Sequence, residues 1–200
     1  LKINKDSLLS GHFNFIENNL LQLTPKELPE VDVVFHAAAL LGVDYVNSNP
    51  SSVVIENVAT FLPLQRYLEN PNVKLVFFST SEVYGDGQTS SGEQISNSSV
   101  IPLNLPDLSK NRSSYALSKI VGEYINSRSS NHINLRPHNI YGTNMGNRHV
   151  IPNLIEKIGN LSADDDLEIF NPSHIRSFCY IDDAINQILY LIEHKKCGNY

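Results

Sequence analysis

Two short apolar segments constrain the fold of this chain more than any other feature. They are Val31 to Phe35 and Val73 to Phe78, which are rich in β-branched and aromatic residues and too short to be helices. Strands that are apolar at successive positions are typical of a parallel sheet covered by helices on both faces. Weaker strand patterns occur at residues 13–16, 133–136, 167–170 and 177–181.

Helical patterns lie between these strands. Residues 51–69 have helical apolar spacing, and Pro63 is expected to kink or divide that helix. Residues 113–129 carry apolar side chains on one side, namely Leu117, Ile120, Val121, Tyr124 and Ile125. Asp182 or Asp183 is expected to cap a last helix, whose buried stripe would be Ile185, Ile188, Leu189 and Ile192. The alternation predicts an α/β fold with a doubly wound parallel sheet. Residues 86–111 form a long polar loop in this prediction.

Composition excludes several classes of function. The formal net charge is −6 and no run of Lys or Arg occurs, which argues against a nucleic-acid partner. No apolar run approaches the ~20 residues that span a bilayer, and the first residues lack the apolar core of a signal peptide. The two cysteines, Cys179 and Cys197, have neither disulfide-framework nor metal-site spacing. These features predict a cytoplasmic protein without a metal site or a membrane partner.

Polar and small residues follow three of the predicted strands. They are His36-Ala37-Ala38-Ala39, Ser79-Thr80-Ser81-Glu82 and Pro137-His138-Asn139. Ligands of open parallel sheets bind beyond the carboxyl ends of the strands, and alanines let a ligand approach the backbone. Each feature has a second interpretation, since alanines are common at strand ends and Ser and Thr cap helices. Their coincidence at one sheet edge favours a binding site.

Tyr115 and Lys119 are four residues apart in the helical segment 113–129. Positions i and i+4 share a helix face, so the phenol and the ammonium can serve one site. A neighbouring cation lowers the pKa of a phenol, which suits abstraction of a proton from a hydroxyl. The spacing alone is more typical of a surface helix pair than of a catalytic one.

Together these segments resemble the extended short-chain dehydrogenase/reductase family that acts on nucleotide-linked sugars, the NAD-dependent epimerases and dehydratases. Six motifs of that family occur in its order, at residues 33–38, 57–60, 79–85, 115–119, 136–142 and 176–183. The resemblance implies a Rossmann-like fold, bound NAD and a nucleotide-sugar substrate. Residues 1–140 would belong to the NAD-binding domain, and residues 141–200 to an interleaved nucleotide-sugar-binding region.

The resemblance also implies roles for single residues. Tyr115 would be the catalytic base, Lys119 would lower its pKa and bind the nicotinamide ribose, and Thr80 would bind the sugar hydroxyl that is oxidised. Ser81 and Glu82 would assist as acid/base or hydrogen-bonding groups. Further NAD contacts would come from Asn19, Leu20, Ala37, Ala38, Ala39, Asn57 and His138, and substrate contacts from Asn139, Arg148 and Arg176. Homodimerisation would use the helix of Tyr115 and the long helix before it.

The resemblance leaves the reaction open. Thr80-Ser81-Glu82 is similar to the UDP-glucuronate decarboxylases and also to the GDP-mannose dehydratases, and epimerases share the other motifs. The nucleotide base, the sugar and the choice between NAD and NADP do not follow from these residues. His36 is expected to be a packed histidine rather than an acid or base.

The sequence departs from the family at its start. No Gly-x-x-Gly-x-x-Gly motif is present, so the chain is expected to begin near the family's third strand. Asn19-Leu20 stands where the family has Asp and an aliphatic residue, and Gly198-Asn199-Tyr200 resembles the start of a strand that continues. Two alternatives to an enzyme therefore stay open: a catalytically silent module that binds NAD or a nucleotide sugar, and a truncated inactive fragment.

Overall fold

A parallel sheet forms the centre of the molecule. The computed structural model describes residues 14–85, 103–146, 149–162, 166–169, 173 and 176–200. Within them, four strands lie in the order β1-β2-β3-β6, with bounds Val33–His36, Lys74–Phe78, His132–Leu135 and Gly198–Asn199. All pairs are parallel, with Val34 opposite Leu75 and Val76 opposite Ile133. The predicted α/β fold with a parallel sheet is confirmed.

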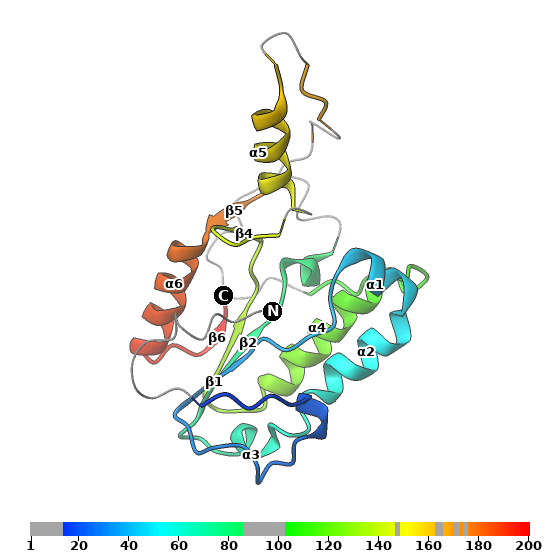
Figure 1. Cartoon of the computed structure of the whole chain (residues 1–200). Helices are drawn as coiled ribbons and strands as arrows, with labels where there is room; N and C mark the ends of the chain where they lie inside the picture. The colour runs from blue at the N-terminus through cyan, green and yellow to red at the C-terminus, as the bar shows by residue number, and fades with distance from the viewer. Residues whose placement is uncertain (1–13, 86–102, 147–148, 163–165, 170–172, 174–175) are drawn as a thin grey trace.

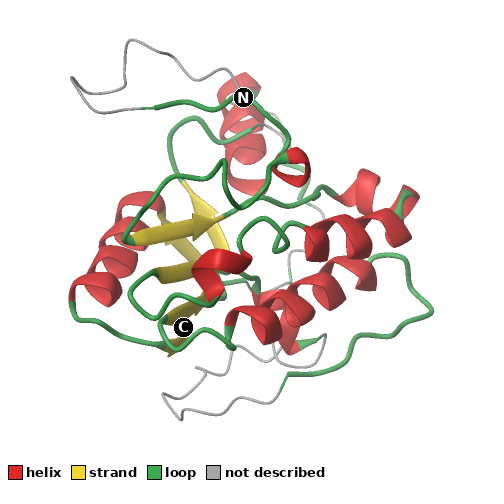
Figure 2. Cartoon of the chain, turned by 90° about the horizontal axis from the view of Figure 1, so that it is seen from below, coloured by secondary structure: helices red, strands yellow, loops and turns green. Residues whose placement is uncertain are grey.

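Helices cover both faces of this sheet, which gives three layers (Figures 1 and 2). On one side lie α1, α2, α3 and α4, with bounds Val43–Ser48, Pro50–Ala59, Gln65–Leu68 and Ser113–Asn126. On the other side lies α6, Ile181–Glu193. Successive residues of β2 face opposite layers: Leu75 and Phe77 join a core with Phe61, Leu64 and Tyr67, whereas Val76 joins one with Ile133.

Smaller elements surround the carboxyl ends of the strands. A 3₁₀ helix, η3, spans Ser81–Tyr84 directly after β2, and another, η2, spans Leu20–Gln22. β4 (Asn139–Tyr141) pairs in parallel with β5 (Phe178–Tyr180) in a separate two-stranded ladder. α5 (Val150–Asn160) projects away from the sheet beyond this ladder (Figure 1). The short ladder thus brings residues after β3 close to residues before α6.

The strand and helix predictions are confirmed in part. Residues 133–136 overlap β3, residues 177–181 contain β5, and Pro63 lies between α2 and α3 as expected. The described parts of residues 13–16 and 167–170 are irregular, so those two strand predictions are wrong there. α1, α5 and β4 were not predicted. In the long loop, residues 103–111 are irregular, and residues 86–102 lie outside the described residues.

The buried face of α4 lies on the opposite side of the helix from the apolar residues predicted to be buried. Its buried residues are small or polar: Ser114, Ala116, Ser118, Lys119, Gly122, Glu123 and Asn126. Tyr124 is 66% exposed. The cause is close packing on β2, because a Cβ added at Gly122 would lie 2.5 Å from Cζ of Phe77. The apolar side of α4 instead lies beside α2 and extends to the surface.

The start and buried stripe of α6 also differ from prediction. Tyr180 occupies the N-cap position, and Asp182 and Asp183 lie in the first turn. The capping prediction is wrong because β5 runs directly into the helix and leaves no room for a polar cap residue. Ile188 and Ile192 pack against the sheet together with Leu191. The other two residues of the predicted stripe, Ile185 and Leu189, are nearly half exposed.

Candidate active site

Residues from distant parts of the chain meet in a cleft at the carboxyl ends of β2 and β3. Its volume is about 600 Å³. Six residues predicted from the sequence line it, namely Thr80, Ser81, Glu82, His138, Asn139 and Arg176. The first turn of α4 forms another wall through Arg112, Ser113 and Ala116. The sheet edge expected to carry a site therefore does carry a polar cleft.

The polar run after β2 is fixed by bonds to β3. The amide of Ser79 donates to the carbonyl of Leu135 at 2.7 Å, and the amide of Ser81 donates to the carbonyl of Pro137 at 3.1 Å. Thr80 is buried, and its Oγ1 accepts from the Glu82 amide at 3.3 Å as the N-cap of η3. The capping interpretation is therefore correct, and it coexists with a position on the cleft wall.

Lys119 is buried and, like Tyr115, is not among the residues that line the cleft. Its Nζ donates to the carbonyl of Phe78 at 2.7 Å and lies 5.6 Å from the ring centre of Tyr115. Burial lowers the pKa of Lys119 to about 8. The ammonium therefore links α4 to the last residue of β2, immediately before Ser79.

The pKa of Tyr115 is raised, contrary to the sequence prediction. Burial is the largest cause, and the negative charge of Glu82 acts in the same direction, whereas Arg112 acts against them. The predicted lowering by Lys119 is wrong for this geometry, because removal of the phenol from water outweighs any nearby cation.

Arg112 is a cleft residue that sequence reasoning missed. Its Nη2 donates to Oε1 of Glu82 at 2.5 Å, and both side chains are a little over one third exposed. Its guanidinium carbon lies 5.5 Å from the ring centre of Tyr115. The signal in the sequence was its position three residues before the tyrosine, which places both on one side of a helix start.

A buried ion pair behind the cleft was also missed. Arg136 donates from Nε and Nη2 to the two carboxylate oxygens of Glu123, at 2.9 and 2.6 Å. The side chains are 6% and 4% exposed. Ser79 Oγ donates to Glu123 at 2.5 Å, and Arg136 Nη1 donates to the Tyr84 hydroxyl at 3.3 Å. This network joins α4 to the ends of β2 and β3, so it positions both walls of the cleft.

The residues after β1 are small, and buried polar side chains hold their loop in place. His36 is buried, its Nε2 lies 3.0 Å from Oγ1 of Thr60, and burial is the main cause that lowers its pKa to about 4. It is a packed histidine, as expected. Ala37 and Ala38 are exposed and Ala39 is half-buried. Asn57 bonds both backbone groups of Leu40 at 2.6 and 3.2 Å, so its amide anchors this loop.

The remaining predicted residues differ in position. Asn139 is exposed, and its amide donates to the carbonyl of Ser177 at 3.1 Å; His138 is half-buried, and burial lowers its pKa. Asn19 caps η2, and Leu20 packs against the core, so neither lines the cleft. Their role in adenine recognition stays a prediction. Arg148 lies outside the described residues.

Metal sites and membrane-spanning helices are two further features that indicate function. Among the described residues, no three His, Cys, Asp or Glu side chains gather as a metal ion requires. No helix in the described ranges combines the length and apolar character needed to cross a membrane. Both cysteines are free thiols.

Comparison with known proteins identifies the family. The model of the NAD dependent epimerase/dehydratase family matches residues 8–200. The chain belongs to this family. It is 27% identical over 206 residues to UDP-glucuronic acid decarboxylase 5 of Arabidopsis thaliana, covering 97% of this chain and 57% of that protein.

Solved structures of the same family have the same fold. The UDP-glucuronic acid 4-epimerase from Bacillus cereus, in complex with UDP-glucuronic acid and NAD, matches with a TM-score of 0.70 and 26% identity over 94% of this chain and 58% of its own. The NDP-hexosamine 5,6-dehydratase TunA matches with a TM-score of 0.70 and 26% identity over 93% and 60%. The Rossmann-like fold is confirmed. The chain spans a little over half the length of these relatives.

Proposed function

We propose that this chain is the catalytic part of an NAD-dependent enzyme that epimerises, dehydrates or decarboxylates a nucleotide sugar, with Tyr115 taking the proton of the sugar hydroxyl. The observation that supports the proposal is the polar cleft lined by Thr80 after β2 and by the first turn of α4, the helix on which the Lys119 ammonium lies 5.6 Å from the ring centre of Tyr115. Family membership supports the reaction class. The three relatives compared above are a decarboxylase, an epimerase and a dehydratase, so the reaction within that class stays open.

The residues present fit the nicotinamide end of NAD. Exposed Ala37 and Ala38 leave the backbone after β1 accessible, and the buried ammonium of Lys119 is bonded to the last residue of the neighbouring strand. When bound there, NAD supplies the hydride acceptor and donor of the reaction. Lys119 and Tyr115 would hold its ribose, His138 would contact it from β3, and Asn57 would act through the Leu40 loop that it anchors.

The chain's own groups then have distinct tasks. Thr80 orients the hydroxyl beside Tyr115, which fixes the geometry of proton transfer. Glu82 and Ser81 face the same cleft and are placed to hydrogen-bond the sugar or to move a second proton. Asn139 and Arg176 line the same cleft, where an amide and a guanidinium suit a diphosphate. Arg148 is the further residue proposed for this task.

The reaction class is tested by product analysis. Protein made from the complete reading frame should be incubated with NAD and a panel of UDP-, GDP-, CDP- and dTDP-sugars, beginning with UDP-glucuronate. Mass spectrometry and NMR of the products distinguish an epimer, a dehydrated sugar and a decarboxylated sugar. Conversion of at least one nucleotide sugar supports the proposal. Tight binding of a nucleotide sugar without any conversion would instead favour the silent binding module.

Substrate binding by the cleft is tested separately. Arg176→Met should weaken binding of the converted nucleotide sugar by a factor on the order of 10, because one charge-assisted bond to phosphate is lost. Calorimetric titration measures this affinity. Lys157→Met, which removes a cation from the last turn of α5, serves as the control and should bind as the wild type does. Equal affinities of Arg176→Met and wild type would remove Arg176 from the substrate site.

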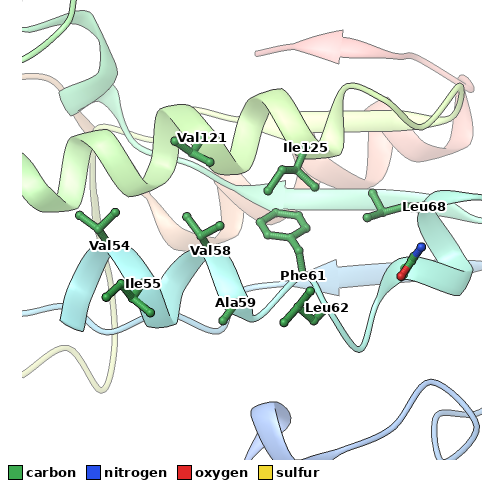
Figure 3. Close-up of a pocket in the computed structure, with 10 residues that line it drawn as sticks. Val54, Ile55, Val58, Ala59, Phe61, Leu62, Leu68, Val121 and Ile125 are labelled. Carbon is green, nitrogen blue, oxygen red and sulfur yellow. The ribbon is translucent and has the colours of Figure 1, made fainter. Parts of the chain in front are cut away.

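We also propose that the chain forms a homodimer through α2 and α4. An apolar groove of about 670 Å³ lies between them and is lined by Val54, Ile55, Val58, Ala59, Phe61, Leu62, Gln65, Leu68, Val121 and Ile125 (Figure 3). Ile55 and Leu62 are 66% and 70% exposed. Contiguous apolar surface of this kind marks an interface. A second copy fits it best, because the residues that line the groove carry no charge and such a surface is self-complementary across a two-fold axis.

The oligomeric state tests this second proposal. Light scattering during size-exclusion chromatography should give the dimer mass for the wild type. Ile55→Lys should shift the protein to the monomer, since it places a charge at the apolar interface. Leu189→Lys is the matched control, because Leu189 is also an exposed aliphatic residue but lies on α6. A monomeric wild type would refute the interface.

A further inference from the structure

Two cations flank the ring of Tyr115 at nearly equal distances. The guanidinium carbon of Arg112 lies 5.5 Å from the ring centre, and Nζ of Lys119 lies 5.6 Å from it. Each cation has a partner of its own. Lys119 donates to the carbonyl of Phe78, and Arg112 pairs with the carboxylate of Glu82.

The two cations differ in the pH range over which they stay protonated. Lys119 is buried, and its pKa of about 8 means that it loses its proton near the upper end of the physiological range. A guanidinium does not lose its proton in proteins. Above pH 8, therefore, Arg112 is the cation that remains beside the phenol.

The charged groups near Tyr115 come from η3 and α4. Glu82 on η3 carries the negative charge, and Arg112 at the start of α4 and Lys119 one turn further carry the positive ones. His138, which follows β3, lines the same cleft as Glu82 and Arg112. Tyr115 is the third residue of α4, whose N-terminal end favours an anion in the first turn. Among these groups, the Arg112–Glu82 ion pair is the one whose separation would change the net charge beside the phenol.

We propose that Arg112 is a positioning residue for Tyr115: it neutralises the Glu82 carboxylate and supplies a second cation that stabilises the phenolate. The effect on the pKa of the phenol is a property of the folded chain without NAD or substrate. Its catalytic consequence rests on the proposed function. The pKa of Tyr115 therefore depends on what Glu82 contacts. A group that binds Glu82 would leave the Arg112 guanidinium unpaired beside the phenol.

The charge arrangement predicts opposite effects for the two partners. Arg112→Met leaves an unpaired carboxylate beside the ring, so the pKa of Tyr115 should rise further. Glu82→Gln leaves an unpaired guanidinium there, so the same pKa should fall. Arg112→Lys keeps the positive charge and should give a pKa closer to the wild type than Arg112→Met does.

The titration can be observed at this residue alone. Replacement of Tyr115 by 3,5-difluorotyrosine places a phenol that titrates near neutral pH at the site, and ¹⁹F NMR follows its ionisation without NAD or substrate. The control is Lys110→Met, because Lys110 lines the same cleft and its Nζ lies 3.8 Å from the Asp107 carboxylate. That control should leave the ¹⁹F titration midpoint unchanged. A thermal melt of each variant establishes that it is folded.

An unchanged or lowered midpoint in folded Arg112→Met would overturn the proposal. A rise in the midpoint of Lys110→Met equal to that of Arg112→Met would do so as well, since the effect would then be one of overall charge. In the active protein, Arg112→Met should move the acidic limb of the kcat/KM pH profile to higher pH. If no nucleotide sugar is converted, the proposed function fails while the ¹⁹F titration still decides the role of Arg112.

Discussion

His36 offers a quantitative test of the packing at the end of β1. Its imidazole is buried between Phe61 and Phe77, whose ring centres lie 4.6 and 5.4 Å away. Burial, assisted by the charge of Lys119, lowers its pKa from 6.5 to about 4. Because the folded state resists protonation more than the unfolded state does, this histidine stabilises the fold fully above pH 6.5. The stabilisation is lost as the pH falls from 6.5 towards 4.

The size of the effect follows from the two pKa values. Between pH 7 and pH 5 the unfolded chain takes up about 0.7 of a proton at this position, whereas the folded chain takes up about a tenth of one. Integration gives a loss of about 2 kcal/mol in the free energy of unfolding over that range. Since His36 is only 3% exposed, solvent screening does not reduce this figure much.

Urea unfolding at pH 7 and pH 5 measures the effect. His36→Asn should be less stable than the wild type at pH 7, and the difference should shrink by about 2 kcal/mol at pH 5. His138 contributes equally to both proteins and cancels. His149→Asn replaces an exposed histidine and should keep the wild-type pH dependence. A stability difference between His36→Asn and wild type that is the same at both pH values would refute the reasoning.

Three further substitutions probe the supports of the cleft, each measured by urea unfolding. Glu123→Gln should cost about 3 to 5 kcal/mol because it leaves a buried guanidinium without its charge partner; a loss no larger than that of exposed Glu193→Gln would contradict this. Gly122→Ala should cost about 1 to 3 kcal/mol because the new methyl group meets Phe77, and a stabilised variant would show that α4 moves freely. Asn57→Ala should cost about 1 to 3 kcal/mol by leaving the backbone groups of its loop unpaired, whereas an unchanged midpoint would place those groups in water.

The central strands were predictable because local sequence determines them. β2 is apolar at nearly every position and is buried almost throughout, so its position in the middle of the sheet follows directly from its composition. The helix faces were less predictable. The apolar side of α4 suggests a core-facing stripe, but the sheet accepts a small and polar face there because β2 approaches so closely at Gly122. Periodicity alone does not distinguish a core from an interface.

The site was predictable where its residues are close in sequence. Tyr115 and Lys119 are one helical turn apart, and the polar run after β2 follows the strand directly. The pairing of Arg112 with Glu82 joins residues 30 positions apart, which no local pattern indicates. The raised pKa of Tyr115 required the structure too, because burial, its largest cause, is a property of the folded chain.

The most direct test of the central claim is the turnover of Tyr115→Phe, measured in protein from the complete reading frame with NAD and the nucleotide sugar that the wild type converts. The account predicts a fall in kcat by a factor on the order of 10² to 10⁴, as expected for loss of a general base. Calorimetry should show nearly unchanged affinity for the nucleotide sugar, since the ring is kept. Wild-type turnover by Tyr115→Phe would contradict the account and place the chemistry on another residue.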